Sequence, residues 1–106
     1  GENQGFYKTT TEIPMEPNIE FGIEFIVKAK KSKAIKIDIV LTYPTPIKNE
    51  KGQIFRNYKD HEKIWTNDKT WTGYVLNKDY ELVPGLWTYE VFYKDKLLYT
   101  KIFKLK

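Results

Sequence analysis

Alternation of apolar and polar residues is the feature that most constrains how this chain can fold. Residues 19–27 carry apolar side chains at every second position, and residues 35–43 repeat the pattern. Successive side chains of a strand point to opposite sides of a sheet, so the pattern predicts two strands that each bury one face. The connection at 29–34 is short and polar, and we expect these two strands to pair as a hairpin.

Four more segments have strand character. Residues 58–65 and 70–76 flank the turn signal Asn67-Asp68-Lys69 and could form a second hairpin, while residues 86–93 and 97–105 flank a tight polar turn at 94–96. In the last segment Leu98 and Ile102 fall out of step with Phe103 and Leu105, which predicts a bulge or a strand buried on both faces. Residues 6–13 carry a weaker strand pattern.

The stretch from residue 44 to residue 57 differs from its neighbours. Pro44 and Pro46 force extended backbone and remove two amide donors, and residues 49–52 offer a turn. We therefore expect this stretch to be the longest irregular segment of the chain.

These elements predict an all-β protein. Six or seven short strands without an amphipathic helix of ten residues are typical of a sandwich or a barrel. The chain has 106 residues, of which 41% are hydrophobic, which suits one globular domain. We expect an antiparallel, immunoglobulin-like two-sheet sandwich of about seven strands over residues 18–106, preceded by an N-terminal segment, residues 1–17, that is a candidate edge strand.

The corner at residues 82–87 favours the sandwich over the barrel. Pro84 and Gly85 turn the chain into a strand, and Trp87 follows two residues after the glycine. Immunoglobulin-like domains commonly place a tyrosine at such a corner, where its hydroxyl bonds to backbone a few residues upstream. An indole N–H can make an equivalent bond, so Trp87 is expected in the core with its donor satisfied by backbone.

Several blocks of the sequence resemble a known family. They are Phe21-Gly22-Ile23, Tyr43-Pro44, Trp71-Thr72-Gly73-Tyr74 and the run from Asp79 to Val91, of which Glu81 to Val91 is the most specific. From about residue 18 onward the chain is similar to the bacterial domain-of-unknown-function family 3859. The resemblance implies an immunoglobulin-like sandwich and an exported protein, in a periplasmic, cell-surface or secreted setting. It implies no activity and no catalytic residues, and this chain departs from the family in its richness in lysine.

The residues themselves point to no enzyme. With no cysteine, the chain has no disulfide, thiolate nucleophile or thiolate metal site. His61 is the one histidine, and on a strand its neighbours Asp60 and Glu62 would point to the opposite face, so an exposed histidine is expected rather than a metal ligand. Ser32 lies in a lysine-rich loop without a glycine elbow. We expect no catalytic site, no metal and no cofactor.

Charge and hydropathy exclude two further classes. No apolar run approaches the roughly 18 residues of a membrane span. The net charge is +4, and every basic residue except Arg56 is a lysine spread among the acids. Base recognition depends on arginine's two-pronged donor geometry, so we expect no nucleic-acid partner.

Two hypotheses about function follow. In the first, the chain is a non-catalytic interaction or accessory domain that binds another macromolecule, with Phe55 and Arg56 of the 44–57 stretch as the first candidates, since loops on rigid sandwiches often carry recognition. A purely structural role for Phe55 is the equal alternative. In the second, it is a carbohydrate-binding module whose exposed aromatic platform is drawn from Trp65, Trp71, Tyr74 and Tyr58. Core packing is the alternative role for these rings, favoured for Trp71 and more evenly balanced for Trp65.

Overall fold

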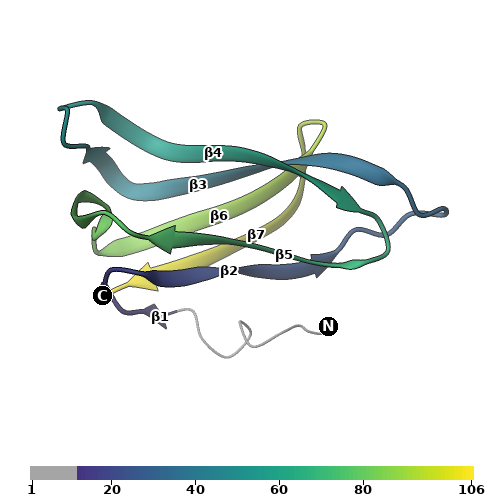
Figure 1. Cartoon of the computed structure of the whole chain (residues 1–106), viewed down its shortest axis with the longest axis horizontal. Coiled ribbons are helices and arrows are strands. Elements are labelled where there is room, and N and C mark those ends of the chain that lie inside the picture. The colour runs from purple at the N-terminus through teal and green to yellow at the C-terminus, as the bar shows by residue number, and fades with distance from the viewer. Residues whose placement is uncertain (1–11) are drawn as a thin grey trace.

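The computed structural model describes residues 12–106, which form seven strands and one short 3-10 turn (Figure 1). The elements are β1 (Glu12–Ile13), β2 (Ile19–Ile26), β3 (Ala34–Lys48), β4 (Ile54–Trp65), β5 (Lys69–Leu76), η2 (Asp79–Glu81), β6 (Gly85–Tyr93) and β7 (Lys96–Leu105). Five strands make one sheet in the order β1-β7-β6-β3-β4, and β2 and β5 make the second. The all-β prediction is confirmed, and no helix within these residues is long and apolar enough to cross a membrane.

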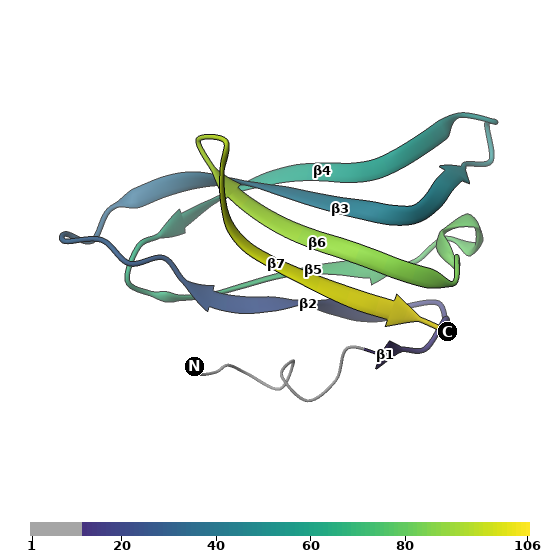
Figure 2. The ribbon, with the colours of Figure 1, turned by 180° about the vertical axis from the view of Figure 1, so that it is seen from behind.

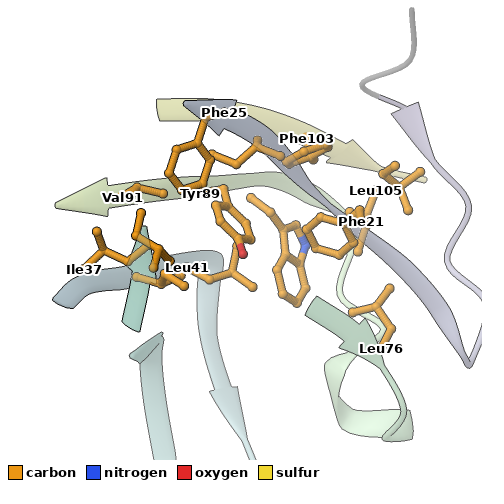
Figure 3. Close-up of a cluster of buried hydrophobic side chains, with 14 of the residues drawn as sticks. Phe21, Phe25, Ile37, Leu41, Leu76, Tyr89, Val91, Phe103 and Leu105 are labelled. Carbon is orange, nitrogen blue, oxygen red and sulfur yellow. The ribbon is translucent and has the colours of Figure 1, made fainter. Parts of the chain in front are cut away.

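The core lies between the two sheets. In Figure 1 the β2–β5 sheet lies in front of β6 and β7, and Figure 2 shows the same layers from behind. The apolar positions of the predicted alternation face inward, and Phe21, Ile37, Leu41, Trp87 and Phe103 are fully buried (Figure 3). The Phe21 ring lies 4.9 Å from that of Phe103 and meets that of Trp87 edge-on at 5.9 Å. Aromatic rings therefore fill the middle of the sandwich.

The predicted pairing of the first four long strands is wrong. β2 pairs with β5 along its whole length, and β3 pairs with β4 and β6. Both predicted hairpin loops instead cross from one sheet to the other at the same end of the sandwich. They hold each other there: the Asn67 side chain bonds the backbone of Ala29, and the Thr66 hydroxyl accepts the amide of Lys33 at 2.9 Å. Period-two alternation fixes which face is buried, and that face is equally buried whichever strand lies beside it.

The predicted hairpin of the last two strands is confirmed. β6 and β7 are antiparallel neighbours joined by Lys94 and Asp95, which both adopt positive φ as a tight hairpin turn requires. Val91 pairs with Tyr99 while Phe92 pairs with Leu97, so Leu98 is the extra residue. The bulge expected from the broken alternation therefore lies at Leu98.

The stretch from 44 to 57 is more regular than predicted. β3 runs on to Lys48 and β4 begins at Ile54, so most of the stretch is a hairpin, which we call the arm (residues 44–57). The ladder pairs Thr42 with Asn57 and next pairs Ile47 with Phe55, so β3 advances five residues where β4 advances two. The two prolines lie in this bulge. Residues of the bulge are not paired in the ladder, so the prolines, which have no amide proton, interrupt none of its hydrogen bonds.

The strictly antiparallel arrangement is wrong at one edge of the larger sheet. β1 runs parallel to β7, with Ile13 opposite Leu105. Ile13 is buried against the core, and β1 is the strand at this edge of the sheet, described from Glu12 onward. The remainder of the predicted 6–13 strand, and most of the 1–17 segment, lie outside the described residues.

Two local features hold the sheets in place. Trp87 is buried, and its indole N–H donates to the carbonyl of Val83 at 3.0 Å, which confirms the predicted corner. Gly22 and Gly73 face each other across β2 and β5. A Cβ atom at Gly22 would lie 2.0 Å from the Thr72 carbonyl oxygen, so only glycine fits where β2 and β5 approach each other here.

Candidate functional site

A small cavity opens on the side of the sandwich between β4 and β5. Residues of β4 and β5 form its rim, and buried residues of β3 and β6 form its floor. We call it the β4–β5 cleft, and its lining is Tyr58, Asp60, Glu62, Gly73 and Tyr74 at the rim with Ile39, Leu41 and Tyr89 beneath. Two acids and three tyrosines thus meet at an opening into the core.

The strand register explains why acids lie at this opening. The β4 partners of the buried β3 residues Ile35, Ile37, Ile39 and Leu41 are, in that order, Ile64, Glu62, Asp60 and Tyr58. Residues directly opposite in an antiparallel pair share a face, so Asp60 and Glu62 lie on the inner face of β4. Burial raises the pKa of Glu62, and the negative charge of Asp60 raises it further. Glu62 is half-buried and Asp60 is exposed, so the two carboxylates repel each other at the mouth of the cleft.

A hydrogen-bonded tyrosine cluster closes one end of the cleft. The Tyr74 hydroxyl donates to the buried carboxylate of Glu81, whose other oxygen accepts the amides of Asn77 and Lys78 at 3.3 and 3.2 Å. Tyr43 interacts electrostatically with Tyr74, and the ring of Tyr58 lies 4.9 Å from that of Tyr74. Glu81 therefore ties β5 to the η2 turn, and Tyr58 joins β4 to β5 at this point.

Burial keeps these phenols protonated. Burial raises the pKa of Tyr74, helped by its bond to Glu81, and raises the pKa of Tyr43 and Tyr58 as well. The Tyr89 hydroxyl lies 2.9 Å from the Thr72 hydroxyl in the core, and burial raises its pKa to about 12. At neutral pH these hydroxyls are hydrogen-bonding groups and not phenolate nucleophiles.

The arm presents apolar side chains to solvent. Ile54 is 65% exposed and Phe55 is 43% exposed, and Arg56 beside them is exposed too. Asn49 fixes the tip: its side-chain oxygen accepts the amides of Lys51 and Gln53, each at 2.9 Å. The two apolar residues are therefore held on an ordered hairpin. A shallow groove separates the tip from the β5–β6 connection and is lined by Lys48, Asn49, Glu50, Asn77, Lys78, Asp79 and Tyr80.

The four rings proposed as a sugar platform do not share a surface. Trp65 is 56% exposed and follows the inward-facing Ile64, so it lies on the outer face of the larger sheet. Trp71 is 39% exposed, pairs with Glu24 and lies on the outer face of the smaller sheet, where its ring covers Gly73. The core position favoured for Trp71 is therefore wrong. Tyr58 and Tyr74 are inclined at 59° to each other inside the cleft.

The remaining residues considered from the sequence, His61 and those of the arm, lie in different parts of the structure. His61 is exposed and opposite Asp38 on the outer face, so the expected split between it and its two acidic neighbours is confirmed. Among residues 12–106 no three histidine, cysteine or acidic side chains gather closely enough to hold a metal ion. The arm residues are brought together at one end of the molecule, away from Trp65 and Trp71.

Sequence reasoning missed the inward position of Asp60 and Glu62. The signal was present, because both share parity with Ile64 and Tyr58, and Ile64 is the apolar residue that marks the buried face. A charged residue on the inner face of a strand is typical of a sheet edge, so the same pattern could also have predicted that β4 is an edge strand. The burial of Glu81 left no comparable signal.

Comparisons with known proteins agree with this fold. Residues 2–105 match a family model described as a domain of unknown function, DUF3859. The chain is also similar to the crystal structure of an immunoglobulin-like protein from Pseudomonas aeruginosa, with a TM-score of 0.79 and 23% sequence identity over 92% of this chain and 79% of that one. No curated protein matches the chain significantly. At this identity the structural likeness shows the fold, which is immunoglobulin-like.

Proposed function

The chain belongs to the DUF3859 family, and on that premise we propose that it is a non-catalytic interaction domain that binds a protein partner through its arm. One observation carries the proposal: Ile54 and Phe55 are both exposed at the end of an ordered hairpin, one on each of its two faces. Apolar and aromatic side chains that a rigid scaffold holds in solvent are suited to fill pockets on a partner.

The order of the arm strengthens the proposal. Asn49 closes the tip with two backbone contacts, and Gly52 supplies the positive φ of +80° that the turn needs. A hairpin already held in one conformation loses less entropy on binding than a flexible loop would. Arg56 is exposed too and follows two residues after Ile54, so its guanidinium lies on the same face as that apolar side chain, a combination often found at binding hot spots.

A protein partner is better supported than a polysaccharide. Stacking on sugar rings needs flat, exposed aromatic surfaces in one plane, and the four candidate rings lie on the two outer faces and in the cleft. As part of the same proposal the domain acts outside the cytoplasm of a bacterium, a setting with which the immunoglobulin-like fold is compatible. Fractionation of the native bacterium with an antibody against the domain tests this setting.

Site-specific crosslinking tests the arm. A photoreactive phenylalanine analogue at Ile54 should capture a defined protein in the native host, and the same analogue at Leu97 should not. Leu97 is 46% exposed and apolar, and it lies beside the β6–β7 turn, well away from the arm (Figure 1). With the captured protein purified, Ile54→Ser and Phe55→Ser should each weaken binding roughly tenfold, about 1.4 kcal/mol, while Leu97→Ser leaves it unchanged.

Two results would contradict the proposal. One is equal capture from Leu97 and Ile54, which would indicate nonspecific adhesion. The other is an unchanged affinity in both arm variants. Both substitutions are at exposed positions and should cost less than about 0.5 kcal/mol of folding stability, so lost binding would not reflect unfolding.

A further inference from the structure

The four edge strands differ sharply in how they are protected against pairing. Within residues 12–106, β1 comprises Glu12 and Ile13. β4 carries five charged residues, two of them facing inward, and charges so placed oppose the addition of a strand. β2 carries Glu20 and Glu24, and the Tyr99 hydroxyl donates to the carbonyl of Ile26 at 2.6 Å at one end of that strand. Over the described residues, these three edges are therefore short, charged or partly covered.

β5 is the exception. Its sequence KTWTGYVL holds one charge, Lys69 at its first position, and is otherwise rich in β-branched and aromatic residues. It pairs with β2 on one side, and none of residues 12–106 forms a strand on its other side. An eight-residue, nearly uncharged edge with high strand propensity is a template for strand addition.

The smaller sheet ends at β5, so it contributes no strand to cover the part of the larger sheet that lies beyond this edge. β3 and β4 lie beyond the edge of β5 in both views (Figures 1 and 2). The β4–β5 cleft opens there, with Ile39 and Leu41 at its floor. A third strand beside β5 would cover this opening, as the additional strands do in larger immunoglobulin sheets. The Tyr58–Tyr74 contact closes the cleft at Tyr74, so the added strand would pair with residues 69–73.

The inner face of β4 defines the chemistry of the missing strand. Asp60 and Glu62 project toward the cleft, two residues apart on one face. In an added strand, side chains at positions i and i+2 point the same way and have the same spacing. We propose that β5 accepts an extended segment of a partner protein as a third strand, with lysine or arginine at i and i+2 facing Asp60 and Glu62. This surface is separate from the arm and does not depend on it.

Backbone pairing and charge pairing have separate roles in this proposal. The β5 amides and carbonyls supply affinity for any extended segment, and the two carboxylates select a basic one. The net charge of +4 opposes a basic partner at long range, but at physiological ionic strength charges more than about 8 Å apart are largely screened. The contact with Asp60 and Glu62 is short-range, and Glu62 is half-buried, so it persists.

A synthetic peptide tests the proposal directly. The probe is an acetylated and amidated peptide of alternating threonine and lysine, with all lysines on one face. We would titrate it to millimolar concentration into the folded domain and follow every backbone amide by NMR. Controls are the same peptide with glutamate in place of lysine, and the lysine peptide with N-methyl groups on the amides that face β5. Asp60→Asn combined with Glu62→Gln removes the acids, and Leu97→Ser is the matched surface control.

The expected result is shifted and exchange-protected amides in residues 69–73. Binding should weaken about tenfold in the double variant, a loss of about 0.7 kcal/mol per charge pair, and stay unchanged in Leu97→Ser. The glutamate and N-methyl peptides should not bind. Four outcomes would each overturn the proposal: no binding at millimolar peptide, protection on β4 or β2 instead, equal binding to the double variant, or self-association of the domain through β5 measured by sedimentation, which would make the occupant a second copy.

Discussion

Replacing Trp87 with phenylalanine should reveal how much the corner before β6 contributes to stability. The indole is fully buried, donates to the Val83 carbonyl at 3.0 Å and lies within 6.4 Å of the rings of Phe21, Tyr43 and Tyr74. The substitution removes one hydrogen bond, worth about 1 kcal/mol. It also leaves a void of roughly 40 Å³, which at about 24 cal/mol per Å³ costs another 1 kcal/mol. We expect a total loss of about 2 kcal/mol.

Urea unfolding followed by circular dichroism measures this loss. The variant should keep the wild-type slope and move its midpoint, because the amount of surface exposed on unfolding hardly changes. A benzothienyl analogue at position 87 keeps the ring shape and replaces the N–H by sulfur, so it should lose only the hydrogen-bond part, about 1 kcal/mol. A phenylalanine variant within about 0.5 kcal/mol of wild type, or a benzothienyl variant as stable as wild type, would refute the argument that the corner is held by this bond.

Three shorter predictions follow. Gly22→Ala should destabilise the domain by more than about 3 kcal/mol or prevent folding, as judged by the same unfolding assay, because the new Cβ would meet the Thr72 carbonyl oxygen at 2.0 Å. Glu62→Gln should stabilise the domain by less than about 1 kcal/mol at neutral pH. The folded-state pKa of Glu62 is raised, so its cost appears as pH rises above 4.5, and the gain in the variant should vanish in melts at lower pH. For Tyr89, whose pKa rises to about 12, the stability of the wild type should fall from about pH 10 upward and fall less steeply in Tyr89→Phe.

The alternation of apolar residues predicted the inner faces of the sheets but not their partners. Phe21, Phe25, Ile37 and Leu41 are buried as the pattern required. Whether residues 29–34 turn back within a sheet or cross to the other depends on contacts distant in sequence. Here the side chain of Asn67 holds the crossing from 38 residues away. A local pattern carries no information about such a contact.

In the candidate site, too, local features were predictable from the sequence and features that depend on distant contacts were not. Exposed apolar residues in the 44–57 stretch were predictable, because Ile54 and Phe55 follow a turn signal and precede a polar strand. The bulge at the two prolines was foreseeable as a break in the ladder, but the regular hairpin beyond it was not, since the ladder resumes at Ile47 opposite Phe55. The cleft depends on β4 and β5 facing each other from different sheets, and therefore on topology.

The pairing of β4 with β3 links these observations. By extending the larger sheet, β4 leaves β5 with one neighbour and leaves part of the β3 inner face beside an opening. An apolar side chain at position 60 or 62 would make the mouth of the cleft apolar, and an apolar surface beside an unpaired strand edge favours nonspecific association. Two carboxylates there keep it solvated while β5 stays available for pairing. Glu62, which costs the isolated domain some stability, thus acts with Asp60 to restrict which strands can complete it, because only a segment that brings positive charge compensates the two acids.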